Sequence, residues 1–121
     1  ALLRLGDEAG LAPLAQEFTD VLFRHFDAGL REAAVGDLAV PRRMRRIAGS
    51  FYGRLEAYSK GLAAVDNSEL AAAISRNALG SDAATPFAGV LADYMRTCRA
   101  LQAAAPADAM FRFDGWPPAP A

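Results

Sequence analysis

The sequence predicts an all-α protein, a compact bundle of about four main helices with an irregular C-terminal tail. Four segments repeat apolar residues every three or four positions, as amphipathic helices do, and no segment alternates with the period of a strand. The chain has 121 residues, 53% of them hydrophobic and 22% charged, which suits one domain with a buried core. We therefore expect residues 1–105 to form the helical domain and residues 106–121 to form the tail.

The first predicted helix covers residues 11–33. Pro13 lies near its start, where a proline costs no helical hydrogen bond. Gly36 is expected to end it, because glycine readily adopts positive φ. Its apolar stripe comprises Leu14, Phe18, Leu22, Phe26 and Leu30.

The second predicted helix covers residues 41–64 and has the most regular pattern in the chain. At 100° per residue, five residues fall on the side opposite the apolar stripe. They are Arg42, Arg46, Gly49, Gly53 and Lys60. That stripe comprises Met44, Ile47, Ala48, Phe51, Leu55, Tyr58 and Leu62.

The third predicted helix covers residues 68–79 and stops at Gly80. Asp66 or Asn67 is its expected N-cap, with Glu69 placed for a reciprocal capping contact. Its expected core residues are Leu70, Ala73, Ile74 and Ala78.

The fourth predicted helix starts with Thr85 as cap and Pro86 in the first turn, and it ends before Pro106. Its stripe comprises Phe87, Val90, Leu91, Tyr94, Cys98 and Leu101. In the tail, the aromatic side chains among Met110, Phe111, Phe113 and Trp116 are expected to dock on the helices.

Positive charge is concentrated in one segment. The net charge of the chain is −1, but residues 38–60 carry six basic side chains and one acidic side chain, a net charge of +5. This pattern indicates local binding of an anionic partner and not general binding of nucleic acid. A second interpretation stays open, in which the acids of the first helix neutralise these cations.

Two features of the second helix favour a binding surface. Arginines at a helix N-terminus oppose the macrodipole, so the run at residues 42–46 is unfavourable without a compensating anion. Gly49 and Gly53 cost helix stability and leave room for another backbone, either a helix of the same domain or a partner. The predicted partner-binding residues are Arg42, Arg43, Arg45, Arg46, Gly49, Tyr52, Gly53, Arg54 and Lys60.

The sequence predicts no catalytic residue, no metal site and no cofactor. His25 is the only histidine and Cys98 the only cysteine, so neither a histidine pair nor a multi-cysteine zinc site is available. Glycines are scattered without a phosphate-binding spacing. No apolar run reaches the ~18–20 residues of a membrane span.

Several strings resemble the ubiquinol–cytochrome c chaperone family. They are V-G-D-L-A-V at residues 35–40, M-R-R-I-A-x-x-F-Y-G-R-L at residues 44–55, A-Y at residues 57–58, R-N-A-L-G at residues 76–80 and A-x-Y at residues 92–94. The resemblance covers residues 11–101, and it implies that residues 1–5 are the end of a helix that starts upstream. The positions carried over are Gly36, Asp37, Leu38, Phe51, Tyr52, Gly53, Arg54, Arg76, Asn77 and Gly80.

The resemblance implies a non-enzymatic assembly chaperone that binds newly made cytochrome b for the ubiquinol–cytochrome c reductase complex of the respiratory chain. It also implies a small helper protein, the ribosome and a peripheral membrane contact as partners, with no DNA. The implied location is the cytoplasm, at the periphery of the inner membrane, or the matrix side in a mitochondrion. An alternative from another class is a small RNA- or ribosome-binding helical module that uses the basic face at residues 42–46.

Overall fold

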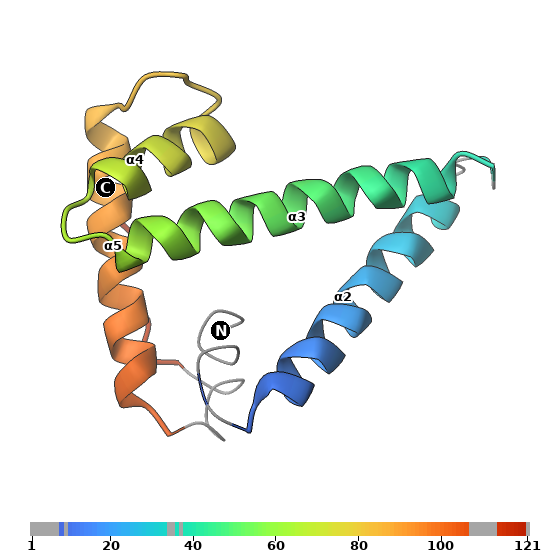
Figure 1. The fold of residues 1–121 in the computed structure, drawn as a ribbon, viewed down its shortest axis with the longest axis horizontal. Coiled ribbons are helices and arrows are strands. Elements are labelled where there is room, and N and C mark those ends of the chain that lie inside the picture. The colour runs from blue at the N-terminus through green and yellow to red at the C-terminus, as the bar shows by residue number, and fades with distance from the viewer. Residues whose placement is uncertain (1–7, 9, 34–35, 37, 107–113, 121) are drawn as a thin grey trace. The chain divides into compact units, whose positions relative to one another are not determined.

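The predicted all-α class is confirmed, with four main helices in the part of the chain that the structure describes (Figure 1). The structure is a computed structural model, and it describes residues 8, 10–33, 36, 38–106 and 114–120. Within those residues there are helices and no strand. The helices are α2 at Ala12–Glu32, α3 at Val40–Ala63, α4 at Ser68–Ile74, its π-helical continuation η1 at Ser75–Leu79, and α5 at Pro86–Ala104.

The helix ends follow mostly from local sequence. Thr85 caps α5, since its Oγ1 accepts the Ala88 N–H at 3.1 Å and Pro86 occupies the first turn. Gly80 ends η1 at φ 65°, in the left-handed region. The expectation that Gly36 caps α2 was wrong, because the helix ends at Glu32 with Ala33 as its C-cap.

The start of α4 differs in detail from the prediction. Asn67 is the residue before the helix, but its side chain makes no capping bond. Instead Asp66 accepts the backbone N–H of Ser68 at 2.8 Å, and it also accepts the Ser68 hydroxyl. These two bonds hold the pKa of Asp66 below its usual value. Glu69 makes no reciprocal capping contact, because its carboxylate pairs with Lys60.

The chain divides into two compact units, and the boundary falls inside α3 between Gly53 and Arg54. We call residues 2–53 the N-terminal unit and residues 54–121 the C-terminal unit. The two are described separately below.

In the N-terminal unit, α2 contacts the first half of α3 through aromatic rings. The Phe23 ring meets Phe51 edge-on at 5.4 Å between centroids. The predicted stripe of α2 was partly wrong, since Leu14 and Phe26 are each 37% exposed whereas Thr19 is buried. The other stripe residues, Phe18, Leu22 and Leu30, are half-buried. Thr19 tolerates burial because its hydroxyl donates to the Ala15 carbonyl at 2.8 Å.

The C-terminal unit has a small core between α4 and α5. Leu70 is fully buried at its centre, and partly buried side chains from α3 and α5 pack around it. The core cluster comprises Leu70, Ala71, Ile74, Ala88 and Ala92. The expected stripe of α5 was therefore partly wrong, because Phe87, Val90 and Leu101 are exposed. Ala78, expected in the core of the preceding helix, is exposed at the end of η1. Small alanines face α4, so the helices pack closely and the larger residues turn outward.

Gly61 allows α3 to meet α4 at very short range. A Cβ added at Gly61 would lie 2.7 Å from the Cα of Leu70. No real Cβ fits at that distance from backbone, so this crossing requires glycine.

Arg96 joins α5 to the turn between α3 and α4. Its guanidinium donates to the carbonyls of Gly61 and Leu62 at 3.0 Å each, and to those of Ala64 and Asp66 at 2.9 and 2.8 Å. It also donates to the side-chain oxygen of Asn67. These bonds satisfy carbonyls that have no helical partner where α3 ends.

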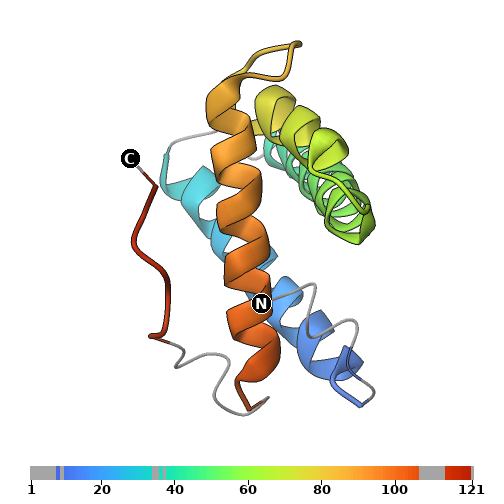
Figure 2. The ribbon, with the colours of Figure 1, turned by 90° about the vertical axis from the view of Figure 1, so that its left-hand side faces the viewer.

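The described end of the tail is irregular and returns along α5 (Figure 2). The Tyr94 hydroxyl donates to the Pro117 carbonyl at 3.1 Å. Trp116 remains 50% exposed. The other predicted docking residues, Met110, Phe111 and Phe113, lie outside the described residues.

Candidate partner-binding surface

The first two turns of α3 carry an unpaired basic surface. Four arginines lie there and all are exposed. Among the described residues, none of their side chains takes part in an ion pair or a hydrogen bond. We call this set, Arg42, Arg43, Arg45 and Arg46, the basic surface.

The acids of α2 do not neutralise this surface in the described part of the chain. Asp27 pairs within its own helix with Arg31, at 2.8 Å between Oδ2 and Nε. Asp20 accepts the Gln16 amide, again within α2, at 2.8 Å. The first turn of α3 contains no acidic residue, so four cations stand uncompensated at the positive end of a helix. This arrangement favours binding of an anion from outside.

Gly49 and Gly53 leave a bare strip on α3 next to the basic surface. Both are exposed, and a Cβ added at either would meet no heavy atom of the described residues within 4 Å. Within the N-terminal unit, α2 therefore does not fill the strip. Exposed glycines of this spacing leave room for a second backbone to approach α3.

Tyr52 lies beside this strip and is 50% exposed. Its ring stacks on Phe23 at 6.1 Å and meets Phe51 edge-on at 5.3 Å. These contacts fix the ring and leave one side open to solvent, a geometry common among residues that anchor partners. Phe51, expected in the core, is only half-buried.

Arg54 and Lys60 are the predicted site residues that belong to the C-terminal unit. Arg54 is exposed. Lys60 is also exposed, but its Nζ lies 3.1 Å from Oε1 of Glu69. The structure thus gives Lys60 an anionic partner within its own unit, unlike the four arginines of the basic surface.

The remaining motif residues have varied surroundings. Arg76 and Asn77 lie on η1, a π-helix, which is a rare element often found at functional sites. Leu38 is 99% exposed before α3. Gly36 accepts the Ala39 N–H at 2.7 Å in the turn between α2 and α3. Asp37 lies outside the described residues.

The predictions of no metal site and no membrane span can be compared with the described residues. No group of three histidine, cysteine or acidic side chains there is placed to hold a metal ion. His25 is exposed and Cys98 is half-buried with a free thiol. None of the described helices is long and apolar enough to cross a membrane.

Sequence reasoning missed three structurally central residues. Phe23 connects three other rings, Gly61 sets the crossing of α3 and α4, and Arg96 holds the turn between them. The sequence position of Arg96 could have indicated its role, because a cation within a half-buried stretch of α5 needs hydrogen-bond acceptors.

The described chain is an all-α protein, and its helix α3 has an exposed cationic and glycine-lined face. Comparison with known proteins specifies the family. Residues 1–114 match the ubiquinol-cytochrome C chaperone family, and the chain belongs to it. The predicted resemblance is thereby confirmed.

A solved structure supports the same assignment. The crystal structure of the Cbp3 homolog from Brucella abortus is 39% identical and superposes with a TM-score of 0.73. The match covers 94% of this chain and 64% of that one, so this chain spans less than two thirds of the relative. Among curated proteins, none matches the chain.

Proposed function

We propose that this protein is a non-enzymatic assembly chaperone that binds newly made cytochrome b during assembly of the ubiquinol–cytochrome c reductase complex. Membership of the ubiquinol-cytochrome C chaperone family is the observation that carries the proposal. The client is the finer part of it, and it rests on the resemblance at residues 35–58 together with the basic surface.

The surface chemistry of α3 suits a protein client. Four unpaired arginines attract acidic groups, and the bare strip at Gly49 and Gly53 admits a helix at close range. Tyr52 supplies an ordered aromatic anchor beside them. A helical client with an acidic end would meet all three features at once.

The proposal extends to where the protein acts. A client that is inserted into the membrane during synthesis places its chaperone on the cytoplasmic or matrix side, close to the ribosome and the inner membrane. A small helper protein and a peripheral membrane contact belong to the same proposal.

The test is capture of the client as it is made. In cells pulse-labelled with radioactive amino acids, the tagged protein should co-purify with labelled cytochrome b early in the chase, and the signal should decline as the complex assembles. Capture of only assembled, unlabelled cytochrome b would contradict a chaperone role. As a control, Arg24→Glu reverses an exposed α2 arginine outside the surface and should leave capture unchanged.

The second candidate function is binding of RNA through the basic surface, favoured by the same four arginines. The salt dependence of binding separates the two. Neutralisation of four phosphates would give a slope of about −3 in log affinity against log salt, on the single-strand value of roughly −0.7 per phosphate. Client binding should give a shallower slope, because the glycine strip and Tyr52 add contacts that salt does not screen to those of the arginines.

A further inference from the structure

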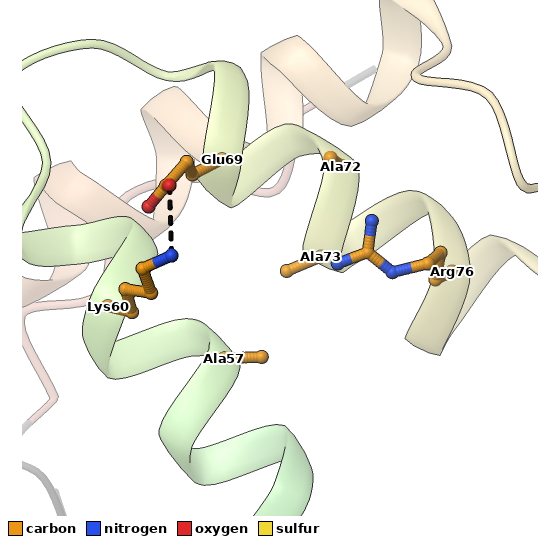
Figure 3. A pocket seen from close by; sticks show the side chains of 6 residues that line it. All are labelled: Ala57, Lys60, Glu69, Ala72, Ala73 and Arg76. Carbon is orange, nitrogen blue, oxygen red and sulfur yellow. Dashed lines mark ion pairs between the residues drawn. The ribbon is translucent and has the colours of Figure 1, made fainter.

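A second candidate site lies inside the C-terminal unit. The last turns of α3 and the α4–η1 segment line an open cavity of about 290 Å³ (Figure 3). Its floor consists of alanine side chains and its rim carries three charged ones. The lining residues are Ala57, Lys60, Glu69, Ala72, Ala73 and Arg76.

The three charged groups of the rim are not equivalent. Lys60 and Glu69 form an ion pair at 3.1 Å and largely satisfy each other. Arg76 is exposed, and no described residue accepts a hydrogen bond from it or pairs with it. Figure 3 shows its side chain extending along the cavity toward Ala73. The rim therefore has a net charge of +1 and one guanidinium fork without an acceptor.

This combination selects a particular chemistry. A guanidinium matches a carboxylate in two parallel hydrogen bonds, and the net charge matches a monoanion. A phosphate dianion would be repelled by Glu69. The alanine floor offers contact for methylene and methyl groups, and the volume lies at the small end of the ~300–1,000 Å³ typical of ligand sites.

We infer that this cavity binds the carboxylate of an acidic side chain in a partner peptide. Arg76 would donate hydrogen bonds to the carboxylate, and the alanines would contact the apolar groups of the peptide next to it. A peptide suits the site better than a free acid. The rim is open to solvent, and a single exposed ion pair contributes little alone. Contacts between the rim and the peptide residues that flank the acidic side chain would supply the rest of the binding free energy. The inference concerns residues 57–76 and does not depend on the client proposed for the basic surface.

The placement of Arg76 on η1 fits this role. Glu69 and Arg76 are two helical turns apart, with Ala72 and Ala73 between them on the same side. The π-helical turn begins at Ser75, next to Arg76. The buried Ser75 fixes that turn, since its hydroxyl accepts the Thr85 N–H at 3.2 Å and its carbonyl accepts the Ser81 N–H at 3.0 Å.

The experiment is an NMR titration of the full chain with short peptides. Acetyl-Ala-Glu-Ala-amide should give saturable shifts in the methyl signals of Ala57, Ala72 and Ala73, whereas acetyl-Ala-Gln-Ala-amide should give none. Equal shifts with both peptides would overturn the proposal. Butyrate and acetyl-Ala-phosphoserine-Ala-amide are titrated in the same way. Tighter binding of either than of the glutamate peptide would also overturn the proposal, because the ligand would then be a free acid or a dianion.

Three variants complete the test. Arg76→Gln should weaken binding of the glutamate peptide at least ~tenfold, since a charge-assisted bidentate contact is lost. Glu69→Gln leaves Lys60 unpaired and raises the rim charge to +2, so it should strengthen binding roughly threefold. Arg24→Gln, an exposed α2 arginine outside the cavity, should change nothing. If Arg76→Gln is poorly folded, the Glu69→Gln result decides alone, and unchanged or weaker binding there overturns the proposal.

Discussion

The Arg96 side chain donates five hydrogen bonds to described residues. Its five acceptors come from four backbone carbonyls and Asn67 where α3 ends, and all lie far from Arg96 in sequence. A guanidinium is needed because its fork reaches several carbonyls at once.

We predict that Arg96→Ala lowers the free energy of unfolding by about 2–4 kcal/mol, because partly buried carbonyls lose their donors. Arg96→Lys should recover only part of this, since an ammonium reaches fewer acceptors. Chemical denaturation measures both. Equal stability of Arg96→Ala and the wild type would show that water replaces the guanidinium.

Tyr94 gives the protein a specific dependence on alkaline pH. Burial raises the pKa of the Tyr94 phenol above its usual value, and a hydrogen bond with Cys98 acts in the same direction. The unfolded chain then loses this proton first as the pH rises. The contribution of the Tyr94 phenol to the free energy of unfolding is therefore complete below its unfolded-state pKa. This contribution is lost as the pH rises through the folded-state pKa.

Tyr94→Phe should remove this alkaline component and also the bond to Pro117. The expected result is a slightly lower melting temperature at pH 7, by the ~0.5–1.5 kcal/mol of one hydrogen bond. Between pH 9 and 11 the variant should lose less stability than the wild type does. Parallel pH profiles for the two proteins would contradict the assignment.

At the scale of elements, α3 contains glycines with opposite roles. Gly61 is pressed against the backbone of Leu70, whereas Gly49 has open space around it. The same substitution should therefore have opposite effects at the two positions.

Gly61→Ala should destabilise the protein by about 1–3 kcal/mol, because its methyl group overlaps Leu70. Gly49→Ala should stabilise it by up to ~1 kcal/mol through helix propensity. If the bare strip receives a partner, Gly49→Ala should nevertheless weaken client capture. Thermal melts and pulse-labelled capture test the pair, and a destabilised Gly49→Ala would mean that the strip is filled within the protein.

The elements show how far the sequence alone could predict the fold. Periodicity placed the helices, and Thr85, Pro86 and Gly80 set their ends, because capping is local chemistry. The buried side of α5 was less predictable. Ala88 and Ala92 face the core while Phe87 and Val90 do not, since close helix packing can outweigh side-chain size.

The exposure of the candidate surface was predictable, because it depends on spacing within one helix. The 100° spacing places Arg42, Arg46, Gly49 and Gly53 opposite the apolar stripe, and all four are exposed. The pairing of Lys60 with Glu69 was not predictable, because it joins two helices across a turn. The contacts of Arg96 were not predictable for the same reason, because they join α5 to the turn between α3 and α4.

At the scale of the whole molecule, we expect one set of residues to stabilise the protein and another set to bind the client. The C-terminal unit holds the core around Leu70, and the basic surface lies in the first turns of α3. Surface changes outside a core usually alter stability by no more than ~0.5 kcal/mol. Binding and folding should therefore respond to different substitutions.

The most direct measurement is capture of pulse-labelled cytochrome b by the Arg42→Glu, Arg46→Glu double variant, with its thermal melt recorded in parallel. Glutamates near a helix N-terminus complement the macrodipole, so the variant should melt at the same temperature or slightly higher. Capture should fall steeply, while Arg24→Glu captures normally. A variant that melts much lower yet captures cytochrome b normally would contradict the account, because the arginines would then stabilise the fold and the client would bind elsewhere.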